Sequence, residues 1–152
     1  MENENGTYVP YYDCETRIHK TIFVGCSWDW KTRCGTCSYA ILGKDGSYEV
    51  HDSTKIKDTN TVRLLLLSVL SGLLRTDPKD NVRIVSNNNA VLYTLNRNNM
   101  GNEKNRDLKS RIADEVSKHK YVCTSVAISA TDDSYLEEVI MSSKKLYGKM
   151  CH

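Results

Sequence analysis

The chain has 152 residues, of which 39% are hydrophobic and 26% are charged, and its formal net charge is +2. This length suits one domain with a single core, and the composition is that of a globular protein rather than a disordered one. The sequence contains neither an apolar run of about 18 residues, which a membrane span needs, nor a basic N-terminus followed by an apolar stretch, which a secretion signal needs. We therefore expect an intracellular protein, in the cytoplasm or nucleus, without membrane contact.

Six cysteines could form three disulfides, but a chain with a full hydrophobic pattern does not need them, so we expect reduced thiols. Cys34-Gly-Thr-Cys37 is a C-x-x-C pair, which together with Cys26 and Cys14 offers four thiolates for zinc. The spacing is not that of paired zinc knuckles. We expect a turn with partly buried thiols instead, and no metal or other cofactor.

The first half of the chain predicts an antiparallel meander. Residues 1–20 show no regular period and contain Pro10, which indicates an irregular lead-in. Three β-rich runs then follow, at Thr21–Ser27, Thr36–Leu42 and Ser47–Ser53. Polar or glycine-containing turns separate them, as in hairpins.

The second half alternates helical and strand patterns. The predicted elements are a helix at Val62–Arg75, a strand at Asn81–Ser86, helices at Ala90–Leu95 and Arg106–Lys120, a strand at Tyr121–Ala130 and a helix at Ser134–Tyr147. Asp58, Thr59, Asn60 and Thr61 can each cap the first helix, and Thr131, Asp132 or Asp133 the last. The order βββαβαβα predicts one α/β domain over residues 21–150, with Asn96–Asn105 as its longest loop.

Local motifs support a resemblance to the ribonuclease H family. The family's first strand reads roughly Ile-Phe-Thr-Asp-Gly-Ser, and this chain has the similar run Ile22-Phe23-Val24-Gly25-Cys26-Ser27. The family's first helix begins Thr-Asn-Asn-Arg-Met-Glu-Leu, and this chain has the similar run Thr59-Asn60-Thr61-Val62-Arg63-Leu64-Leu65-Leu66. Three further runs of this chain are similar to family motifs. Cys37–Leu42 resembles the second-strand motif Gly-Tyr-Gly-Ala-Ile-Leu, and Ser86–Asn88 resembles the fourth-strand end Thr-Asp-Ser. Asn105–Arg111 resembles the later helix start Asn-x-Asp-Leu-x-x-Arg. The resemblance covers about residues 21–147 and implies a five-stranded mixed sheet flanked by helices.

The resemblance also implies that the catalytic acids are missing. Ribonuclease H enzymes hold two divalent ions with clustered carboxylates, but here the first three acidic positions are Gly25, Leu65 and Asn87. Small alignment shifts do not restore them, because residues 21–28, 59–76 and 81–96 contain no acid. Only the last position has candidates, Asp132 and Asp133, and we favour a helix cap for both.

The family's flexible histidine would fall near Ser129 or Ala130, where no histidine stands. We expect the histidines of this chain, His119 among them, to lie at the surface.

The leading hypothesis is a catalytically inactive scaffold or protein-recognition module. Trp28 and Trp30 are the candidate contacts for a protein partner, with burial against the N-terminal residues as the alternative. Such a module can still bind RNA or an RNA/DNA hybrid. The candidate contact residues are Lys31, Arg33, Asn60, Thr61, Arg63, Asn87, Asn88 and Asn89. For the three neighbouring asparagines, a tight strand-to-helix turn is an equal alternative. The oligomeric state stays open.

The competing hypothesis is an active nuclease with a rearranged metal site. Its ligands would come from Asp29, Asp58, Asp132 or Asp133, which lie in predicted turns rather than on the strand core.

Overall fold

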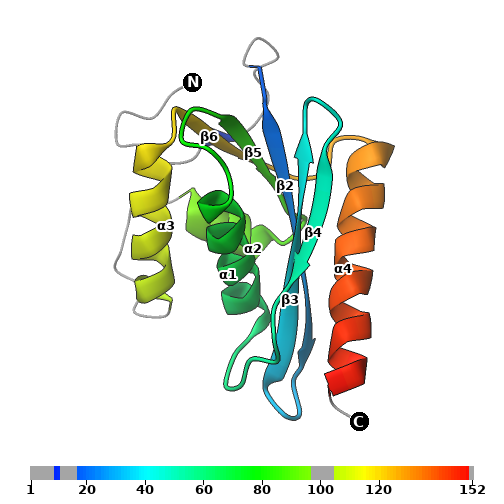
Figure 1. Cartoon of the computed structure of the whole chain (residues 1–152). Coiled ribbons are helices and arrows are strands. Elements are labelled where there is room, and N and C mark those ends of the chain that lie inside the picture. The colour runs from blue at the N-terminus through cyan, green and yellow to red at the C-terminus, as the bar shows by residue number, and fades with distance from the viewer. Residues whose placement is uncertain (1–8, 11–16, 97–104, 151–152) are drawn as a thin grey trace.

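The computed structural model describes residues 9–10, 17–96 and 105–150, which form an α/β fold around one mixed sheet (Figure 1). The strands are β1 (Val9–Pro10), β2 (Lys20–Asp29), β3 (Cys34–Gly43), β4 (Tyr48–Asp52), β5 (Asn81–Val85) and β6 (Tyr121–Ser125). The helices are α1 (Thr61–Leu74), α2 (Asn89–Leu95), α3 (Arg106–Lys118) and α4 (Ala130–Met150). From Lys20 onward every predicted helix and strand is present in the predicted sequence order, but the order βββαβαβα is corrected to βββαβααβα, because α2 and α3 both lie between β5 and β6.

Strand β2 lies at the centre of the sheet, whose order is β1-β6-β5-β2-β3-β4. On one side β2 pairs antiparallel with β3 along all ten residues, and β3 pairs antiparallel with β4, so the predicted meander is confirmed. On the other side β5 and β6 run parallel to β2. The β2–β3 turn is shorter than the predicted Trp28–Gly35, because both strands extend to a tip of four residues.

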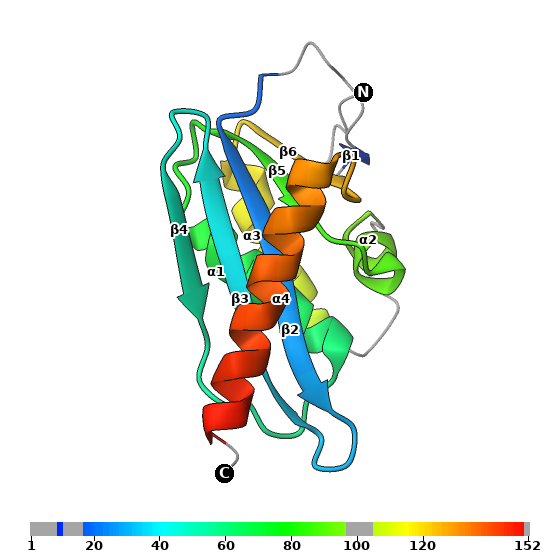
Figure 2. The ribbon, with the colours of Figure 1, turned by 90° about the vertical axis from the view of Figure 1, so that its right-hand side faces the viewer.

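Helices cover both faces of the sheet (Figures 1 and 2). Helix α1, with α3 packed beside it, covers the face that carries Ile22, Val24 and Ile84. Helix α4 covers the opposite face, where Phe23 and Val85 pack against it. Alternate residues of β2 therefore enter two separate cores, as the two-residue period of a strand requires.

The end of the chain differs from the prediction. Strand β6 ends at Ser125 instead of Ala130, and α4 begins at Ala130 instead of Ser134. Ser129 is the cap, because its Oγ accepts a hydrogen bond from the Asp132 backbone N–H at 3.1 Å and its carbonyl oxygen accepts one from the Asp133 N–H at 3.1 Å. The prediction that Thr131, Asp132 or Asp133 caps this helix is wrong, since all three lie in its first turn.

Two further points concern the flanking segments. The expected irregular lead-in contributes β1, which pairs parallel with β6. Residues 97–104 of the predicted Asn96–Asn105 loop lie outside the described residues. In the part of the chain that the structure describes, no helix combines the length and apolar character of a membrane span.

Candidate functional site

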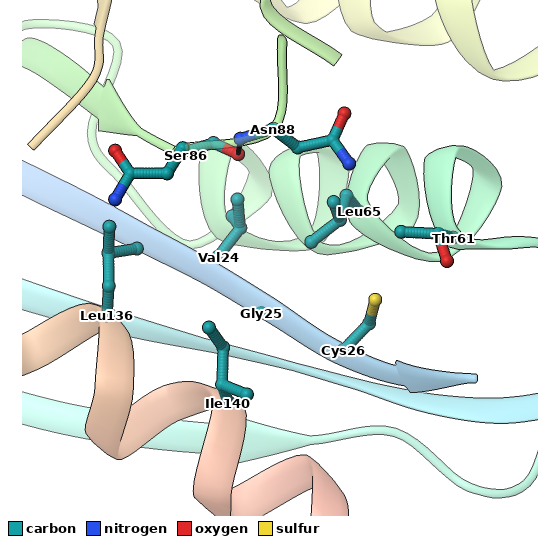
Figure 3. A pocket seen from close by; sticks show the side chains of 10 residues that line it. Val24, Gly25, Cys26, Thr61, Leu65, Ser86, Asn88, Leu136 and Ile140 are labelled. Atoms are coloured by element: carbon teal, nitrogen blue, oxygen red, sulfur yellow. Dashed lines mark hydrogen bonds between the residues drawn. The ribbon is translucent and has the colours of Figure 1, made fainter. Parts of the chain in front are cut away.

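A pocket opens where β5 ends and β2 continues. The parallel pairing of the two strands stops at Phe23 and Val85, while β2 runs on to Asp29. The pocket has a volume of about 330 Å³ and lies between α1, α4 and the loop after β5 (Figure 3). Its lining residues are Val24, Gly25, Cys26, Thr61, Leu65, Ser86, Asn87, Asn88, Leu136 and Ile140.

The three positions at which the resemblance requires acids meet in this pocket. Gly25 comes from β2, Leu65 from α1 and Asn87 from the loop after β5, so residues 62 positions apart in the chain line one cavity. None of the ten lining residues carries a carboxylate. Aliphatic side chains form most of the wall, and neutral polar groups form one rim.

Helix α4 occupies the space in front of Gly25. A Cβ atom built on Gly25 would lie 3.0 Å from the Ile140 backbone nitrogen, and equally close to side-chain carbons of Ile140 and Val139. Contacts of this length are tighter than nine in ten real Cβ contacts, so a larger residue would require Ile140 and Val139 to shift by a few tenths of an ångström. The close packing of α4 therefore disfavours a side chain at this position.

Asn87 and Asn88 build the turn from β5 into α2. The Asn88 Oδ1 accepts a hydrogen bond from the Val91 N–H at 2.9 Å and caps α2, whose first residue is Asn89. The Asn87 Oδ1 accepts one from the Ala127 N–H at 2.9 Å, which ties the turn to the segment before α4. The tight strand-to-helix turn, expected as the alternative to nucleic-acid contact, therefore accounts for the amides of Asn87 and Asn88.

Two of the other predicted nucleic-acid residues have structural partners as well. Asn60 caps α1, since its Oδ1 accepts a hydrogen bond from the Arg63 N–H at 2.9 Å. The Arg63 guanidinium binds both carboxylate oxygens of Asp107 on α3, at 2.8 and 3.1 Å, and lowers the pKa of Asp107 to about 2. Thr61 lines the pocket, whereas Lys31 and Arg33 are exposed at the tip of the β2–β3 hairpin.

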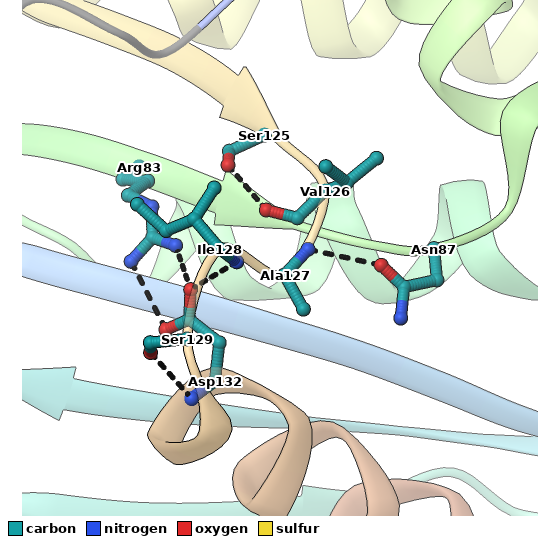
Figure 4. A network of polar contacts seen from close by, with 8 residues as sticks. All are labelled: Arg83, Asn87, Ser125, Val126, Ala127, Ile128, Ser129 and Asp132. Carbon is teal, nitrogen blue, oxygen red and sulfur yellow. Dashed lines mark hydrogen bonds and ion pairs between the residues drawn. The ribbon is translucent and has the colours of Figure 1, made fainter.

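The acids of the competing hypothesis do not converge. Asp132 is buried and pairs with the Arg83 guanidinium of β5, and its Oδ2 also accepts the Ile128 N–H at 3.0 Å (Figure 4). Asp133 and Asp58 are exposed on separate segments. Asp29 accepts hydrogen bonds from the Lys31 N–H at 2.9 Å and the Tyr147 hydroxyl at 3.3 Å, and these bonds lower its pKa.

The cysteines that the structure describes show no ligand arrangement. Cys26, Cys34 and Cys37 are free thiols, and Cys26 lies opposite Cys37 on β3; Cys14 is outside the described residues. Burial raises the pKa of Cys26 to about 12, so its thiolate is scarce at neutral pH. Within the ranges that the structure describes, no group of three or more His, Cys, Asp or Glu residues could hold a metal ion.

The two tryptophans and His119 differ in exposure. Trp28 is half-buried, and its indole N–H donates to the Thr59 carbonyl oxygen at 2.8 Å, so it packs within its own chain. Trp30 is exposed at the hairpin tip. The prediction of a surface position for His119 is wrong, because it is buried and its two ring nitrogens contact the Thr76 hydroxyl and the Glu115 carbonyl oxygen.

Sequence reasoning missed part of the pocket wall and the ion pair behind it. Leu136 and Ile140 belong to the apolar stripe of α4, and periodicity does not say which stripe residues face a cavity. The only signal for the ion pair was a charged residue, Arg83, inside a β-branched strand.

No model of a known protein family matches this chain, and no curated protein sequence is similar to it.

Proposed function

We propose that this protein is a catalytically inactive ribonuclease H-like module that acts by binding a protein partner. The observation that carries the proposal is the pocket, where Gly25, Leu65 and Asn87 meet without a carboxylate among the lining residues. The order of the strands supports the fold assignment. An antiparallel meander lies on one side of β2 and the parallel strands β5 and β6 lie on the other, as the family resemblance implies; the two-residue strand β1 is a sixth strand beyond the five expected.

The chemistry of the pocket argues against metal-dependent hydrolysis. Magnesium needs several hard oxygen ligands in near-octahedral geometry, and two-ion catalysis needs bridging carboxylates. The pocket offers Val24, Leu65 and Ile140 instead, with neutral amides at its rim. Such a wall favours an apolar side chain over a hydrated cation.

The edge of β2 indicates the kind of partner. The edge of β2 that pairs with β5 does so only as far as Phe23. From there to Trp28, whose indole N–H bonds to the Thr59 carbonyl oxygen, this edge has no strand partner among the described strands. An extended peptide can pair with such an edge through its backbone. Its side chains would point alternately towards Leu65 of α1 and Ile140 of α4, so we propose an extended, apolar segment of another protein as the ligand.

A cleavage assay tests the inactive assignment. Labelled RNA/DNA hybrid is incubated with the full chain and Mg²⁺ or Mn²⁺, and we expect no cleavage above the protein-free control. Metal-dependent cleavage that Asp132→Asn or Asp133→Asn abolishes would overturn the assignment and support the rearranged acidic site.

A peptide-display selection tests the binding assignment. We expect enriched peptides with apolar residues at alternate positions, and we expect Ile140→Glu to abolish their binding because it places a charge in the pocket. Met141→Glu is the matched control, since it introduces the same residue on the exposed face of α4. Failure to enrich any peptide, or equal losses in both variants, would contradict a binding role for the pocket.

A further inference from the structure

One end of the molecule concentrates positive charge. It consists of the β2–β3 hairpin tip, the segment between β4 and α1, and the last turns of α4, which lie at the same end in Figures 1 and 2. We call this surface the basic end. Its exposed cations are Lys31, Arg33, Lys55, Lys57, Lys144, Lys145 and Lys149.

Hydrogen bonds hold the three segments of the basic end together. Ile56 and Gly35 form a two-bond bridge at 2.8 and 3.0 Å, and the Thr59 N–H donates to the Arg33 carbonyl oxygen at 2.9 Å. The Tyr147 hydroxyl of α4 lies 3.1 Å from the Thr32 hydroxyl at the hairpin tip. The cations therefore belong to one connected surface.

The charge at this end exceeds that of the whole chain. Residues 29–34, 52–59 and 141–149 contain the seven cations and three acids, Asp29, Asp52 and Asp58, which is a formal charge of +4 against +2 for the complete sequence. The rest of the chain is therefore net negative. No ion pair involving the seven cations is found within the described residues. Such a one-sided distribution attracts polyanions.

Trp30 gives the basic end a stacking surface. Its side chain is 70% exposed, and the Lys31 ammonium lies 5.7 Å from the ring centroid. The turn that carries it is fixed by two bonds to Asp29, from the Arg33 N–H at 2.8 Å and the Lys31 N–H at 2.9 Å. An exposed aromatic ring among cations is the combination on which unpaired bases stack while the cations bind phosphates.

We propose that the basic end binds single-stranded nucleic acid, with Trp30 stacking on a base and Lys31 and Arg33 binding the backbone. This role goes beyond the proposed peptide binding and uses a different surface. A duplex keeps its bases stacked on each other, so the ring favours a single strand. An anionic membrane would need a broader apolar face, but Trp30 and Met141 are the only exposed large hydrophobic residues described in these segments.

Fluorescence anisotropy with labelled oligonucleotides of about 16 nucleotides, oligo-U and oligo-dT, tests the proposal on the full chain. We expect binding that weakens as salt rises, and about a tenfold loss of affinity in Trp30→Ala that Trp30→Phe largely restores. The double variant Lys31→Glu/Arg33→Glu should bind more weakly and show a flatter salt dependence, because fewer phosphate counterions are released.

The matched control is Lys79→Glu/Lys120→Glu. It makes the same change in net charge at exposed positions before β5 and β6, at the opposite end of the sheet, and should keep most of the affinity. Four outcomes would overturn the proposal: no oligonucleotide binding at low salt, an equal loss in the control, no effect of Trp30→Ala, or equally tight binding of a duplex. Binding to phosphatidylserine vesicles but not to oligonucleotides would assign the basic end to membranes instead. Ile140→Glu should bind oligonucleotides normally, so this test and the peptide test can fail separately.

Discussion

At position 25 the absence of a side chain matters because α4 lies directly against β2. The first carbon of any side chain at this position would lie 3.0 Å from Ile140 and from Val139. Under the proposed ribonuclease H-like assignment, the missing acid at position 25 goes together with the close packing of α4. Introducing an acid at position 25 alone would disturb the core on the α4 face and would add only one of the three carboxylates that the proposed family's metal site has at positions 25, 65 and 87.

Comparing two glycine substitutions tests this packing. Gly25→Ala should lower the free energy of unfolding by about 1–3 kcal/mol, because the added methyl group overpacks the contact with α4. Gly148→Ala, in a helical position with open space around it, should raise that energy by up to about 1 kcal/mol. Urea unfolding followed by circular dichroism measures both. A Gly25→Ala variant as stable as the wild type would show that α4 can move and that packing does not explain the glycine.

Single residues show how far the sequence predicts this site. Gly25, Leu65 and Asn87 could be chosen from motif positions alone, and the structure places all three on one pocket. The partners of Arg63 and Asp132 could not be predicted, because Asp107 and Arg83 lie 44 and 49 residues away in the chain. A local pattern identifies a charged residue but does not say which distant charge it meets.

Helix α4 is attached to the sheet by polar contacts at its first turn. The buried Asp132 joins this turn to Arg83 of β5 and to the Ile128 N–H, and Asn87 binds Ala127 nearby (Figure 4). These contacts fix the start of the helix that lines the pocket with Leu136 and Ile140. Asp132, one of the two acidic candidates at this position, thus has a structural role.

Removing this carboxylate should destabilise the fold strongly. Asp132→Ala leaves the buried Arg83 guanidinium without its counter-charge, and breaking a buried pair in this way costs about 3–5 kcal/mol. Asp133→Ala, on the exposed side of the same turn, should cost less than about 1 kcal/mol, the scale of a helix-dipole interaction. Thermal and urea unfolding of both variants measure the difference. Similar losses in the two would mean that the ion pair contributes no more than a surface charge.

Element positions were easier to predict than element ends. The apolar periods of α1 and α3 and the β-rich runs of β2 and β3 identify these elements, because each period reflects a face buried in the core. The boundary between β6 and α4 was misplaced by four to five residues. Ser129, Thr131, Asp132 and Asp133 are all chemically able to cap a helix, and the choice depends on the tertiary contact with Arg83.

The whole molecule divides into regions of different character. The pocket is mostly apolar and lies at the edge of the central strand, whereas the basic end carries more positive charge than the entire chain. One strand connects the two surfaces, since β2 runs from the pocket to the hairpin tip. If both proposals are correct, the protein is an adaptor that holds a peptide segment and a nucleic-acid strand together.

Carboxylates spread over the molecule make its stability depend on acid pH. The pKa of Asp107 is lowered to about 2 by hydrogen bonds from Arg63, and the pKa values of Asp29 and Asp45 are lowered by hydrogen bonds from Lys31 and Ser47. When the pKa of a carboxyl group is lower in the folded state, the unfolded chain takes up the proton at a higher pH than the folded protein does. Lowering the pH therefore favours the unfolded chain. The contribution of Asp107 is therefore complete above its ordinary pKa of 3.8 and disappears as the pH falls towards 2.

We accordingly expect the free energy of unfolding to fall between about pH 5 and about pH 2, measured by urea unfolding at fixed salt. In Asp107→Asn and in Arg63→Gln this fall should be smaller by a similar amount, because each variant removes the same hydrogen-bonded ion pair. The difference in stability between wild type and Asp107→Asn should be present at pH 5 and shrink towards pH 2. A difference that stays constant over this range, or that grows as the pH falls, would contradict the assignment of the Arg63–Asp107 pair as a source of acid sensitivity.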